Sequence, residues 1–587
     1  MSCDKLVYDL SQEVEGSPNV FIRKDWLNIL DNQNQNYQNN QSIIDTSQLA
    51  NSNKYMGYRE AYLAIPMLLS YRTPEAAGGV NITPNDYSVS LKNWFGSIIH
   101  SMTLDYNGTT IVQQTPFCNI WNSFKLLTTL SWSDVSTMGS TIGFYPDTSD
   151  SWLYYTNAAN TVYGVGICNN ADGGYVVPTT STLVTNRYTQ PIVAVAGTPA
   201  VGGNIGMTYR TKWIAYNPAA ADGTGTYGAS FLSTAYASQI WKSNISNKQA
   251  SAGNGTQGIL QISIMGTIYL RHLHAFFNMC PLLKGVFMKL TFNLNNATCT
   301  IANSAAVQAL QGCTTSTTYV GGIQPILVPS SNTGGLLSNI PAATNAVYDL
   351  VVGSRCYNNL ITNPPAGSPA SADGNVAKSV YLYIPAYTFN PTFEQAYLSN
   401  NIKQIKYTDI YQYQFDFSSG QTGFNQLITN GIANIKSVLI VPFYKVPMAT
   451  GGAAVVQFTS PFDPAGAGTV APMTSLTNFN IQISGQNAIY NMQRYSFEEW
   501  NNQLYGQNAV NGGLTDGLTS GLIDFNDFQN SYSYYYVNVE RMLPVEQSVP
   551  KSVQVLGQNL GTLDIRAYVF IEYGVQVSID VLTGARV

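Results

Sequence analysis

Short apolar runs separated by turn residues make up most of the chain, and this pattern predicts β-strands. The run over 98–104, the turn at Asn107-Gly108 and the run over 109–112 predict a β-hairpin, because Asn-Gly tolerates the positive φ of a tight turn. Further strands are predicted over 259–270, 286–294, 407–417, 435–443, 479–483, 567–573 and 575–579. We therefore expect an all-β protein with few helices.

Two helices interrupt the strand pattern, and each carries a tryptophan. Thr115-Pro116 offers an N-cap and a proline at the first helical position, and apolar residues then recur at three- and four-residue spacing through Trp121. In the second half, the segment 496–499 reads SFEE, which is the capping-box pattern, and Trp500 lies on the apolar face that follows.

The two halves of the chain share an order of features. The pattern Tyr-Leu-x-Ile-Pro occurs at 62–66 and at 381–385, and each copy is an apolar run closed by proline. Each half also contains a strand, a glycine turn, a strand and a Trp-bearing helix, from which we infer an internal duplication of a β domain of roughly 230–250 residues. The positions predicted to have a structural role are Pro66, Pro385, Gly108, Gly485, Trp121 and Trp500.

Charged residues make up only 10% of the 587 residues, whereas about 25% is typical of soluble proteins. Asn, Gln, Ser, Thr, Gly and 39 tyrosines replace them. The net charge of −5 argues against a protein that binds nucleic acid by neutralising phosphates. A weakly charged surface instead favours large neutral contacts between subunits.

The cysteines and the start of the chain bear on where the protein is made. The 7 cysteines are scattered without a CxxC pair, and the first residues lack the layout of a signal peptide. No apolar run approaches the roughly 20 residues that span a bilayer. These features predict reduced thiols and synthesis inside the cell.

Histidine chemistry is sparse. His100 lies in an apolar strand, where a buried core histidine is the expected interpretation. His272 and His274 would present both rings on one face of a strand, which is compatible with a metal site, and Cys280 is the soft ligand nearby. No third histidine or nearby carboxylate completes such a site, so we predict no metal.

Other candidate residues favour structural interpretations. Asp524 and Asp527 are compatible with calcium, but the aromatic residues between them favour a packed loop with solvated acids. The tyrosines of 532–536 are compatible with stacking on sugars or bases, or with one buried face and one interface face. Without GxSxG, HExxH or Walker motifs, we predict no catalytic residue, no cofactor and a protein that is not an enzyme.

Four stretches, at 58–66, 391–398, 431–443 and 568–584, carry a family resemblance. As an ordered set they resemble the double jelly-roll major capsid proteins of polinton-like viruses, virophages and adenovirus-like DNA viruses. The resemblance covers residues 55–587. It implies two tandem eight-stranded jelly rolls with short helices and long surface loops.

The resemblance also implies how the chain associates. It implies a homotrimer whose six jelly rolls form a pseudo-hexameric capsomer in the icosahedral shell of a double-stranded DNA virus. Neighbouring capsomers, a penton protein and minor capsid proteins are the implied partners, and the implied location is the virion. Strong direct binding of nucleic acid is not expected, and no prediction is made about an internal membrane.

Domain boundaries follow from the composition together with the resemblance. The predictions are an N-terminal arm over 1–54, a first jelly roll over 55–300, a connecting segment over 301–375 and a second jelly roll over 376–587. The loop-like stretch 135–258 is predicted to form a tower-like insertion.

The alternative is a carbohydrate-binding jelly-roll module or adhesin. Jelly rolls also form lectins, and loops rich in Tyr and Asn suit carbohydrate. A secreted adhesin would be expected to begin with a signal peptide, so the structural interpretation leads.

Overall fold

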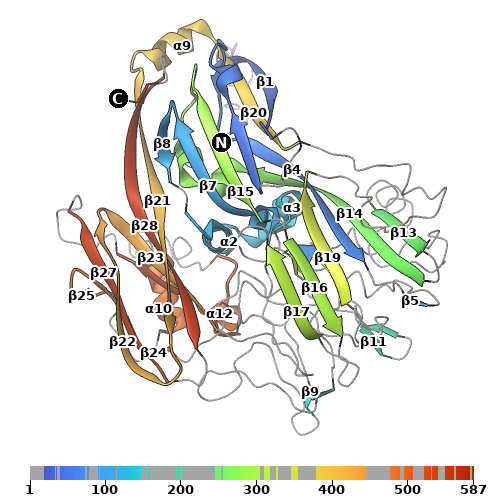
Figure 1. Cartoon of the computed structure of the whole chain (residues 1–587). Helices are drawn as coiled ribbons and strands as arrows, with labels where there is room; N and C mark the ends of the chain where they lie inside the picture. Colours follow the sequence, from blue (N-terminus) through green and yellow to red (C-terminus); the bar gives the residue numbers. More distant parts are fainter. Residues whose placement is uncertain are drawn as a thin grey trace, which may run out of the picture.

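Figure 1 shows a computed structural model in which two β-sandwich units lie side by side. We call them roll 1 and roll 2. The structure describes residues 19–33, 35, 37, 40–72, 76–77, 90–91, 93–113, 115–144, 146, 156–157, 181–182, 193–195, 198–200, 245–252, 255–295, 297–303, 310–317, 326–327, 345–353, 379–444, 476–489, 495–506, 521–530, 532–539, 549–560, 564–581 and 585–586.

Roll 2 is an eight-stranded sandwich of two antiparallel sheets with the orders β21-β28-β23-β26 and β22-β27-β24-β25. With its strands lettered B to I in chain order, the sheets are B-I-D-G and C-H-E-F, which is the strand order of a jelly roll. The strands are β21 (Ile402–Phe417), β22 (Gln421–Ile432), β23 (Ile435–Tyr444), β24 (Leu476–Ile483), β25 (Gln486–Asn487), β26 (Tyr535–Asn538), β27 (Lys551–Asn559) and β28 (Ile565–Asp580).

Roll 1 has the same order. Its B-I-D-G sheet is β1-β20-β4-β14 and its C-H-E-F sheet is β2-β15-β7-β8. The strands are β1 (Phe21–Leu30), β2 (Gln41–Asp45), β4 (Tyr62–Arg72), β7 (Ile99–Tyr106), β8 (Thr109–Val112), β14 (Gly255–Tyr269), β15 (Met288–Leu294) and β20 (Tyr381–Phe389). The predicted all-β fold of two tandem eight-stranded jelly rolls is confirmed.

Further strands extend roll 1 or form small pairs. Six strands join its B-I-D-G sheet: β3 (Tyr55–Met56), β5 (Ala76–Ala77), β13 (Ile245–Ala252), β16 (Ala297–Asn303), β17 (Leu310–Thr317) and β19 (Asn345–Val352). Three separate pairs are β6 (Ser90–Leu91) with β18 (Ile326–Leu327), β9 (Thr156–Asn157) with β10 (Ser181–Thr182), and β11 (Val193–Val195) with β12 (Thr198–Ala200).

The helices are short and lie in the connections. They are η1 (Ser47–Leu49), η3 (Phe95–Ile98), α2 (Cys118–Thr129), α3 (Trp132–Ile142), α6 (Leu270–Leu273), α7 (Ala275–Met279), α9 (Pro391–Leu398), α10 (Phe497–Asn501), η6 (Asn502–Gly506) and α12 (Phe525–Asn530). Helix α9 connects the last strand of roll 1 to the first strand of roll 2, with Asn390 as N-cap and Pro391 at the first position. No helix in the described part of the chain is long and apolar enough to cross a membrane.

The boundaries of the rolls differ from the predicted ones. Residues 21–30 and 41–45 lie in the predicted arm, yet they are strands B and C of roll 1. Strand β20 (381–389) lies in the predicted second roll, yet it pairs with β1 and β4 as strand I of roll 1. The reason is that a jelly roll places its first and last strands side by side, so roll 1 closes only after its long internal connections. Much of the predicted insertion (135–258) and connecting segment (301–375) lies outside the described residues.

The two Tyr-Leu-x-Ile-Pro segments are therefore not equivalent strands of a duplication. They are strands D and I of the same sheet, and they pair directly through Tyr62 and Tyr383. Pro66 and Pro385 do not close these strands, which continue to residues 72 and 389. A proline lacks only the N–H donor, and the two proline carbonyls still accept from the N–H groups of Gly353 and Gly57, both at 2.9 Å.

The hairpin and helix are the features that do correspond between the rolls. Strands E and F are joined by Asn107-Gly108 in roll 1 and by Ser484-Gly485 in roll 2, and all four residues have positive φ. Two positive φ values in a row suit a tight turn between twisted strands. The Trp-bearing helices α2 and α10 then occupy the same connection, between strands F and G.

Candidate interaction sites at the junction and on the outer sheet faces

Strand β28, in the sheet β21-β28-β23-β26 of roll 2, is buried on both faces over residues 567–571. Val569 and Ile571 on β28 belong to the core of roll 2. Tyr568 and Phe570 alternate with them and join the cluster that contains the core of roll 1. A strand buried on both faces has a near-continuous apolar sequence, and 567–571 reads AYVFI. Roll 1 therefore covers the outer face of this sheet around Tyr568 and Phe570.

Aromatic side chains of α2 and of its N-cap residue supply much of this cover. The Trp121 ring centroid lies 6.0 Å from that of Phe570. Phe117, the N-cap residue, lies 5.1 Å from Tyr568 in an edge-to-face arrangement. Phe124 stacks edge-on against Tyr534 at 5.3 Å. Such pairs contribute about 0.5–1.5 kcal/mol each beyond the area they bury, so the helix couples the two rolls.

A buried carboxylate extends the contact of α2 with roll 2. Lys125 Nζ lies 3.5 Å from Glu572 Oε1, and the Ser437 hydroxyl donates to Glu572 Oε2 at 2.7 Å. Burial raises the pKa of Glu572, but the charge of Lys125 and the hydrogen bond from Ser437 outweigh it, so the pKa lies below its ordinary value. The carboxylate stays ionised and paired at neutral pH.

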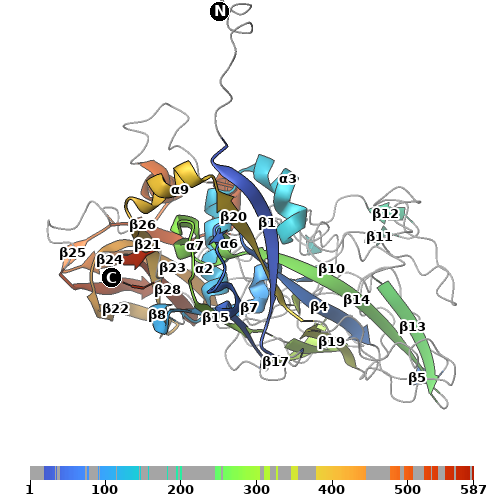
Figure 2. The ribbon, with the colours of Figure 1, turned by 90° about the horizontal axis from the view of Figure 1, so that it is seen from above.

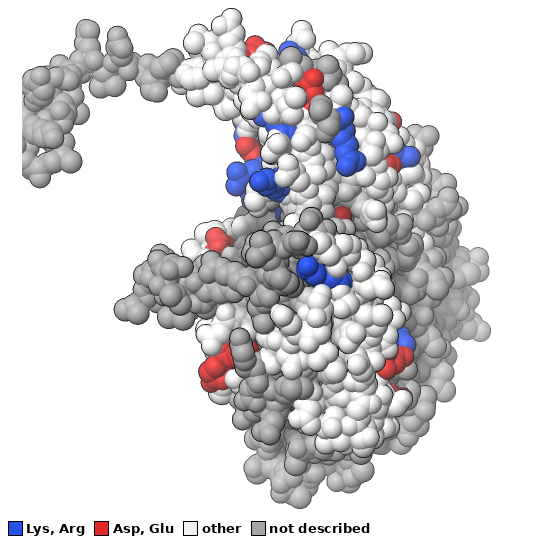
Figure 3. All heavy atoms as spheres, turned by 90° about the vertical axis from the view of Figure 1, so that its left-hand side faces the viewer, with Lys and Arg blue, Asp and Glu red and all other residues white. Residues whose placement is uncertain are grey.

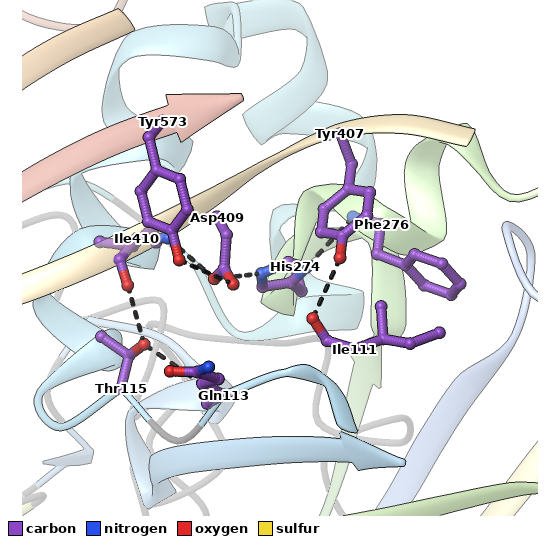
Figure 4. A network of polar contacts seen from close by, with 9 residues as sticks. All are labelled: Ile111, Gln113, Thr115, His274, Phe276, Tyr407, Asp409, Ile410 and Tyr573. Carbon is purple, nitrogen blue, oxygen red and sulfur yellow. Dashed lines mark hydrogen bonds and ion pairs between the residues drawn. The ribbon is translucent and has the colours of Figure 1, made fainter. Parts of the chain in front are cut away.

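His274 and Asp409 form a second polar contact between the rolls (Figure 4). The Phe276 N–H donates to His274 Nδ1 at 3.1 Å, so Nε2 carries the proton of the neutral ring and donates to Asp409 Oδ1 at 3.2 Å. The Asp409 carboxylate also accepts from the Ile410 N–H at 2.8 Å and from the Tyr573 hydroxyl at 3.3 Å. With these donors in place, the buried carboxylate is satisfied.

Two side-chain hydroxyls reach across the junction to backbone carbonyls (Figure 4). Thr115 Oγ1 donates to the Ile410 carbonyl of roll 2 at 3.0 Å, and the Tyr407 hydroxyl donates to the Ile111 carbonyl of roll 1 at 3.0 Å. The prediction that Thr115 caps α2 is wrong. The N-cap residue is Phe117, at φ 56 with no side-chain cap, because the helix begins later and the threonine hydroxyl bonds to roll 2.

The histidines differ in part from their predictions. His100 is a buried residue of strand β7, as predicted. His272 lies in α6, whereas His274 is the N-cap residue of α7, so the prediction of two rings on one strand face is wrong. Burial lowers the pKa of both His100 and His272 to about 4. Among the described residues, no group of three or more His, Cys, Asp or Glu is placed to hold a metal.

The acidic candidates Asp524 and Asp527 lie at the N-terminal end of helix α12. Asp524 Oδ1 accepts from the Asp527 N–H at 2.7 Å, where α12 begins. Asp527 is buried, so the predicted loop with two solvated acids is a short helix with one exposed and one buried acid. At α10, the Glu499 N–H donates to Ser496 Oγ at 3.4 Å, which is the backbone half of the predicted capping box. Cys280, which follows α7 in roll 1, is buried and is a free thiol.

The tyrosine segment 532–536 has the predicted alternation. Tyr532, Tyr534 and Tyr536 belong to the cluster shared with roll 1, and Tyr535 belongs to the core of roll 2. The interface that this segment serves is therefore the junction inside the chain. Trp500 is fully buried against Phe528, and Trp121 is buried at the junction.

The outer face of the B-I-D-G sheet of roll 1 carries four aromatic side chains, which we call the aromatic row: Trp26, Tyr383, Tyr62 and Tyr269. Tyr62 is central, with ring-centroid distances of 5.7 Å to Trp26, 5.1 Å to Tyr383 and 5.7 Å to Tyr269. Trp26 is 50% exposed, and the tyrosines are partly exposed. This row was not predicted from the sequence, because Trp26 lies in the predicted N-terminal arm. The even spacing of Ile22, Trp26 and Leu30 is nevertheless the signal that places all three on one face of a strand.

The C-H-E-F sheet of roll 2 presents an uncharged surface. Strands β22, β24 and β25 contain no charged residue, and β27 contains Lys551. Figure 3 shows this side of the molecule, where Lys, Arg, Asp and Glu gather in small groups and leave wide uncharged areas between them. Large neutral contacts avoid the desolvation penalty of buried charges.

The strand orders of the two rolls define the class: the protein is a double jelly roll. Among solved structures, the chain is similar to a chain of the Sputnik virophage, with 9% identity, 97% of this chain and 88% of that chain covered, and a TM-score of 0.49. It is also similar to the mavirus major capsid protein, with 9% identity, 98% and 92% covered, and a TM-score of 0.44. It is similar to the Faustovirus major capsid protein as well, with 8% identity, 98% of this chain and 94% of that chain covered, and a TM-score of 0.41.

No protein-family model matches the chain, and no curated protein matches it significantly. The TM-scores to the solved structures are below 0.5. The assignment of the fold therefore rests on the strand order and register of the two rolls.

Proposed function

We propose that this chain is the major capsid protein of a double-stranded DNA virus and that it acts by self-assembly. The observation that carries the proposal is the tandem of two jelly rolls held as one body by the junction. Aromatic contacts of α2 and the buried contacts of Asp409 and Glu572 fix the position of one roll against the other. A fixed pair of similar rolls is a suitable repeating unit for a closed ring.

Three such chains would bring six jelly rolls around one axis, which gives a pseudo-hexameric capsomer. The low content of charged residues supports this proposal, because broad contacts then form with little desolvation of charge. Neighbouring capsomers, a penton protein and minor capsid proteins are the further partners, and the location is the virion. Catalysis has no part in the proposal.

Light scattering of the purified protein, with negative-stain images of the same peak, tests the proposal. We expect a particle with three times the 63.9 kDa mass of one chain and a hexagonal outline. A stable monomer at micromolar concentration would contradict the trimer. A monomer that binds a defined glycan on an array would favour the carbohydrate-binding alternative.

A further inference from the structure

Equivalent rows of residues cross the B-I-D-G sheets of the two rolls. In roll 2 the row is Gln412, Phe570, Leu439 and Tyr536, each directly opposite the next. In roll 1 it is Asn28, Tyr383, Tyr62 and Tyr269, in the same strand order. Both rows begin with an amide and continue with three large apolar or aromatic side chains. Residues directly opposite each other share one face of a sheet.

The two rows differ in what covers them. Phe570 and Leu439 are 0% exposed, because helix α2 of roll 1 lies against that face. The row of roll 1 has no such cover in the described part of the chain: Trp26 beside it is 50% exposed, and Leu30 and Met265 on the same face are 51% and 56% exposed. An apolar patch of this kind on an outer sheet face marks an interaction site.

We propose that the aromatic row binds roll 2 of a second copy of this chain, through the two helices α10 and α12, which together we call the α10–α12 segment. The proposal rests on the proposed function and names the contact that would close the trimer. Within the chain, the helix between strands F and G of roll 1 covers the outer face of roll 2. Helix α10 lies in the same connection of roll 2. Its Trp500 is buried within the chain, whereas Glu498 on α10 and Phe525 on α12 are exposed, so these two positions offer the surface for an equivalent contact with roll 1 of another copy.

The composition of the two surfaces is complementary. Around the aromatic row, the next row across the sheet is Leu30, Tyr381, Ala64 and Thr267, without a charge. Lys24 and Arg271 border the row and lie over the rings of Trp26 and Tyr269, and Lys24 is paired with Glu60, so the border is polar and carries both signs of charge. On the α10–α12 segment, Phe525 is 46% exposed and lies 5.8 Å from Phe497, and the acids Glu498 and Asp524 are exposed beside it. An apolar centre with a polar rim is the usual anatomy of an interface.

Tyrosine suits a face that is wet before assembly. The rings supply large contact area, while the hydroxyl groups remain hydrated in the monomer. Figure 2 shows that roll 2 and the strands β4 and β14 lie on opposite sides of α2. A contact between two different surfaces of neighbouring copies is head-to-tail, and three such contacts close a ring of three chains.

The test compares the substitutions Trp26→Arg on the row and Phe525→Arg on the α10–α12 segment with a matched control, Trp132→Arg. Trp132 is 53% exposed on α3, close to the 50% of Trp26. In light scattering, each of the two test variants is expected to be a monomer, and the control a trimer. Mixing the two monomeric variants leaves one intact contact, so the mixture is expected to form a particle of two chains.

The outcomes separate the inference from the proposed function. A trimeric wild type with a trimeric Trp26→Arg variant overturns the inference and leaves the capsid proposal standing. A monomeric wild type contradicts both. If near-ultraviolet circular dichroism shows that Trp26→Arg is unfolded, Asn28→Asp adds a charge to the row without changing its shape. The protein concentration at which half of the chains form trimers should be at least tenfold higher for Asn28→Asp than for the wild type. An unchanged concentration overturns the inference.

Discussion

The outer faces of the two B-I-D-G sheets share a strand order but differ in chemistry. The face of roll 2 is covered within the chain, and its row is built from Phe570, Leu439 and Tyr536. The face of roll 1 remains partly exposed, and its row contains three tyrosines. The centre of the covered row, Phe570 and Leu439, has no polar group, whereas the tyrosines of the exposed row keep hydroxyl groups that water can hydrate.

The comparison also separates two kinds of contact. The covered face belongs to a junction with buried polar contacts, such as that of His274 with Asp409. The exposed face has its charges at the border, where Lys24 pairs with Glu60 at 2.5 Å in a half-exposed pair. The first kind fixes geometry during folding, and the second suits association between folded chains.

The substitution Trp121→Ala should have the largest effect, because it removes a buried ring that touches both rolls. We expect a loss of about 3–5 kcal/mol in the free energy of unfolding. Urea denaturation followed by circular dichroism measures it, with Trp132→Ala as the control. Trp132 is 53% exposed, and its replacement should change stability by less than about 0.5 kcal/mol. Equal effects of the two substitutions would show that α2 does not hold the junction.

Acid should weaken roll 1 in a defined pH range. Burial lowers the pKa of His100 and His272 to about 4, so the folded state resists their protonation. The unfolded chain binds those protons near pH 6.5, and stability therefore falls as the pH falls from about 6.5 to about 4. At pH 5 we expect a loss of roughly 2 kcal/mol for each histidine relative to pH 7.

The double variant His100→Gln, His272→Gln identifies the source of this effect. Its unfolding free energy should change less between pH 7 and pH 5 than that of the wild type. The carboxylate of Glu572 does not confuse the comparison, because its lowered pKa places its loss of stability below this range. An identical pH dependence in both proteins would assign the effect to other groups.

Substitutions of two aspartates in strand β21 allow the stability contribution of the buried junction to be compared with that of an exposed ion pair. Asp409→Asn removes the charge from the buried acceptor of His274, Tyr573 and the Ile410 N–H, and we expect a loss of about 2 kcal/mol. Asp416→Asn is the control, since Asp416 pairs with Arg566 at 2.8 Å in a partly exposed position and should contribute less than about 1 kcal/mol. Equilibrium unfolding of both variants decides whether burial makes the difference.

Local patterns allowed much of the fold to be predicted from the sequence. The hairpin predicted over 98–112 and the two Trp-bearing helices have strong periodicity or turn residues, and the structure contains them. The strands predicted over 567–573 and 575–579 are one continuous strand, β28. The boundaries of the rolls were harder to predict. Strands that pair across more than 350 residues, as β1 and β20 do, leave no local signal of that pairing.

The junction was predicted least well, for a physical reason. Asp409 is one of two acids in strand β21, and nothing near it in the sequence distinguishes it from Asp416, because its partner His274 lies 135 residues away. Thr115 has the features of a helix cap, and only the tertiary structure offers its hydroxyl the Ile410 carbonyl instead. Local preference predicts elements, whereas contacts between rolls depend on packing.

The smallest expected effect tests whether the two rolls are equivalent at their E–F hairpins. Gly108 and Gly485 have φ of +78° and +80°, and an added Cβ would meet nothing within 4 Å in either turn. Replacement by Ala therefore introduces backbone strain without a clash, and each variant should lose about 1 kcal/mol. Gly423 on β22 is the control, because its surroundings are equally open and its φ is not in the left-handed region. Thermal melts should show similar small decreases for Gly108→Ala and Gly485→Ala and no decrease for Gly423→Ala. A large loss in one roll alone would show that its hairpin makes a contact that the other lacks, and the rolls would then differ in more than the cover of their sheets.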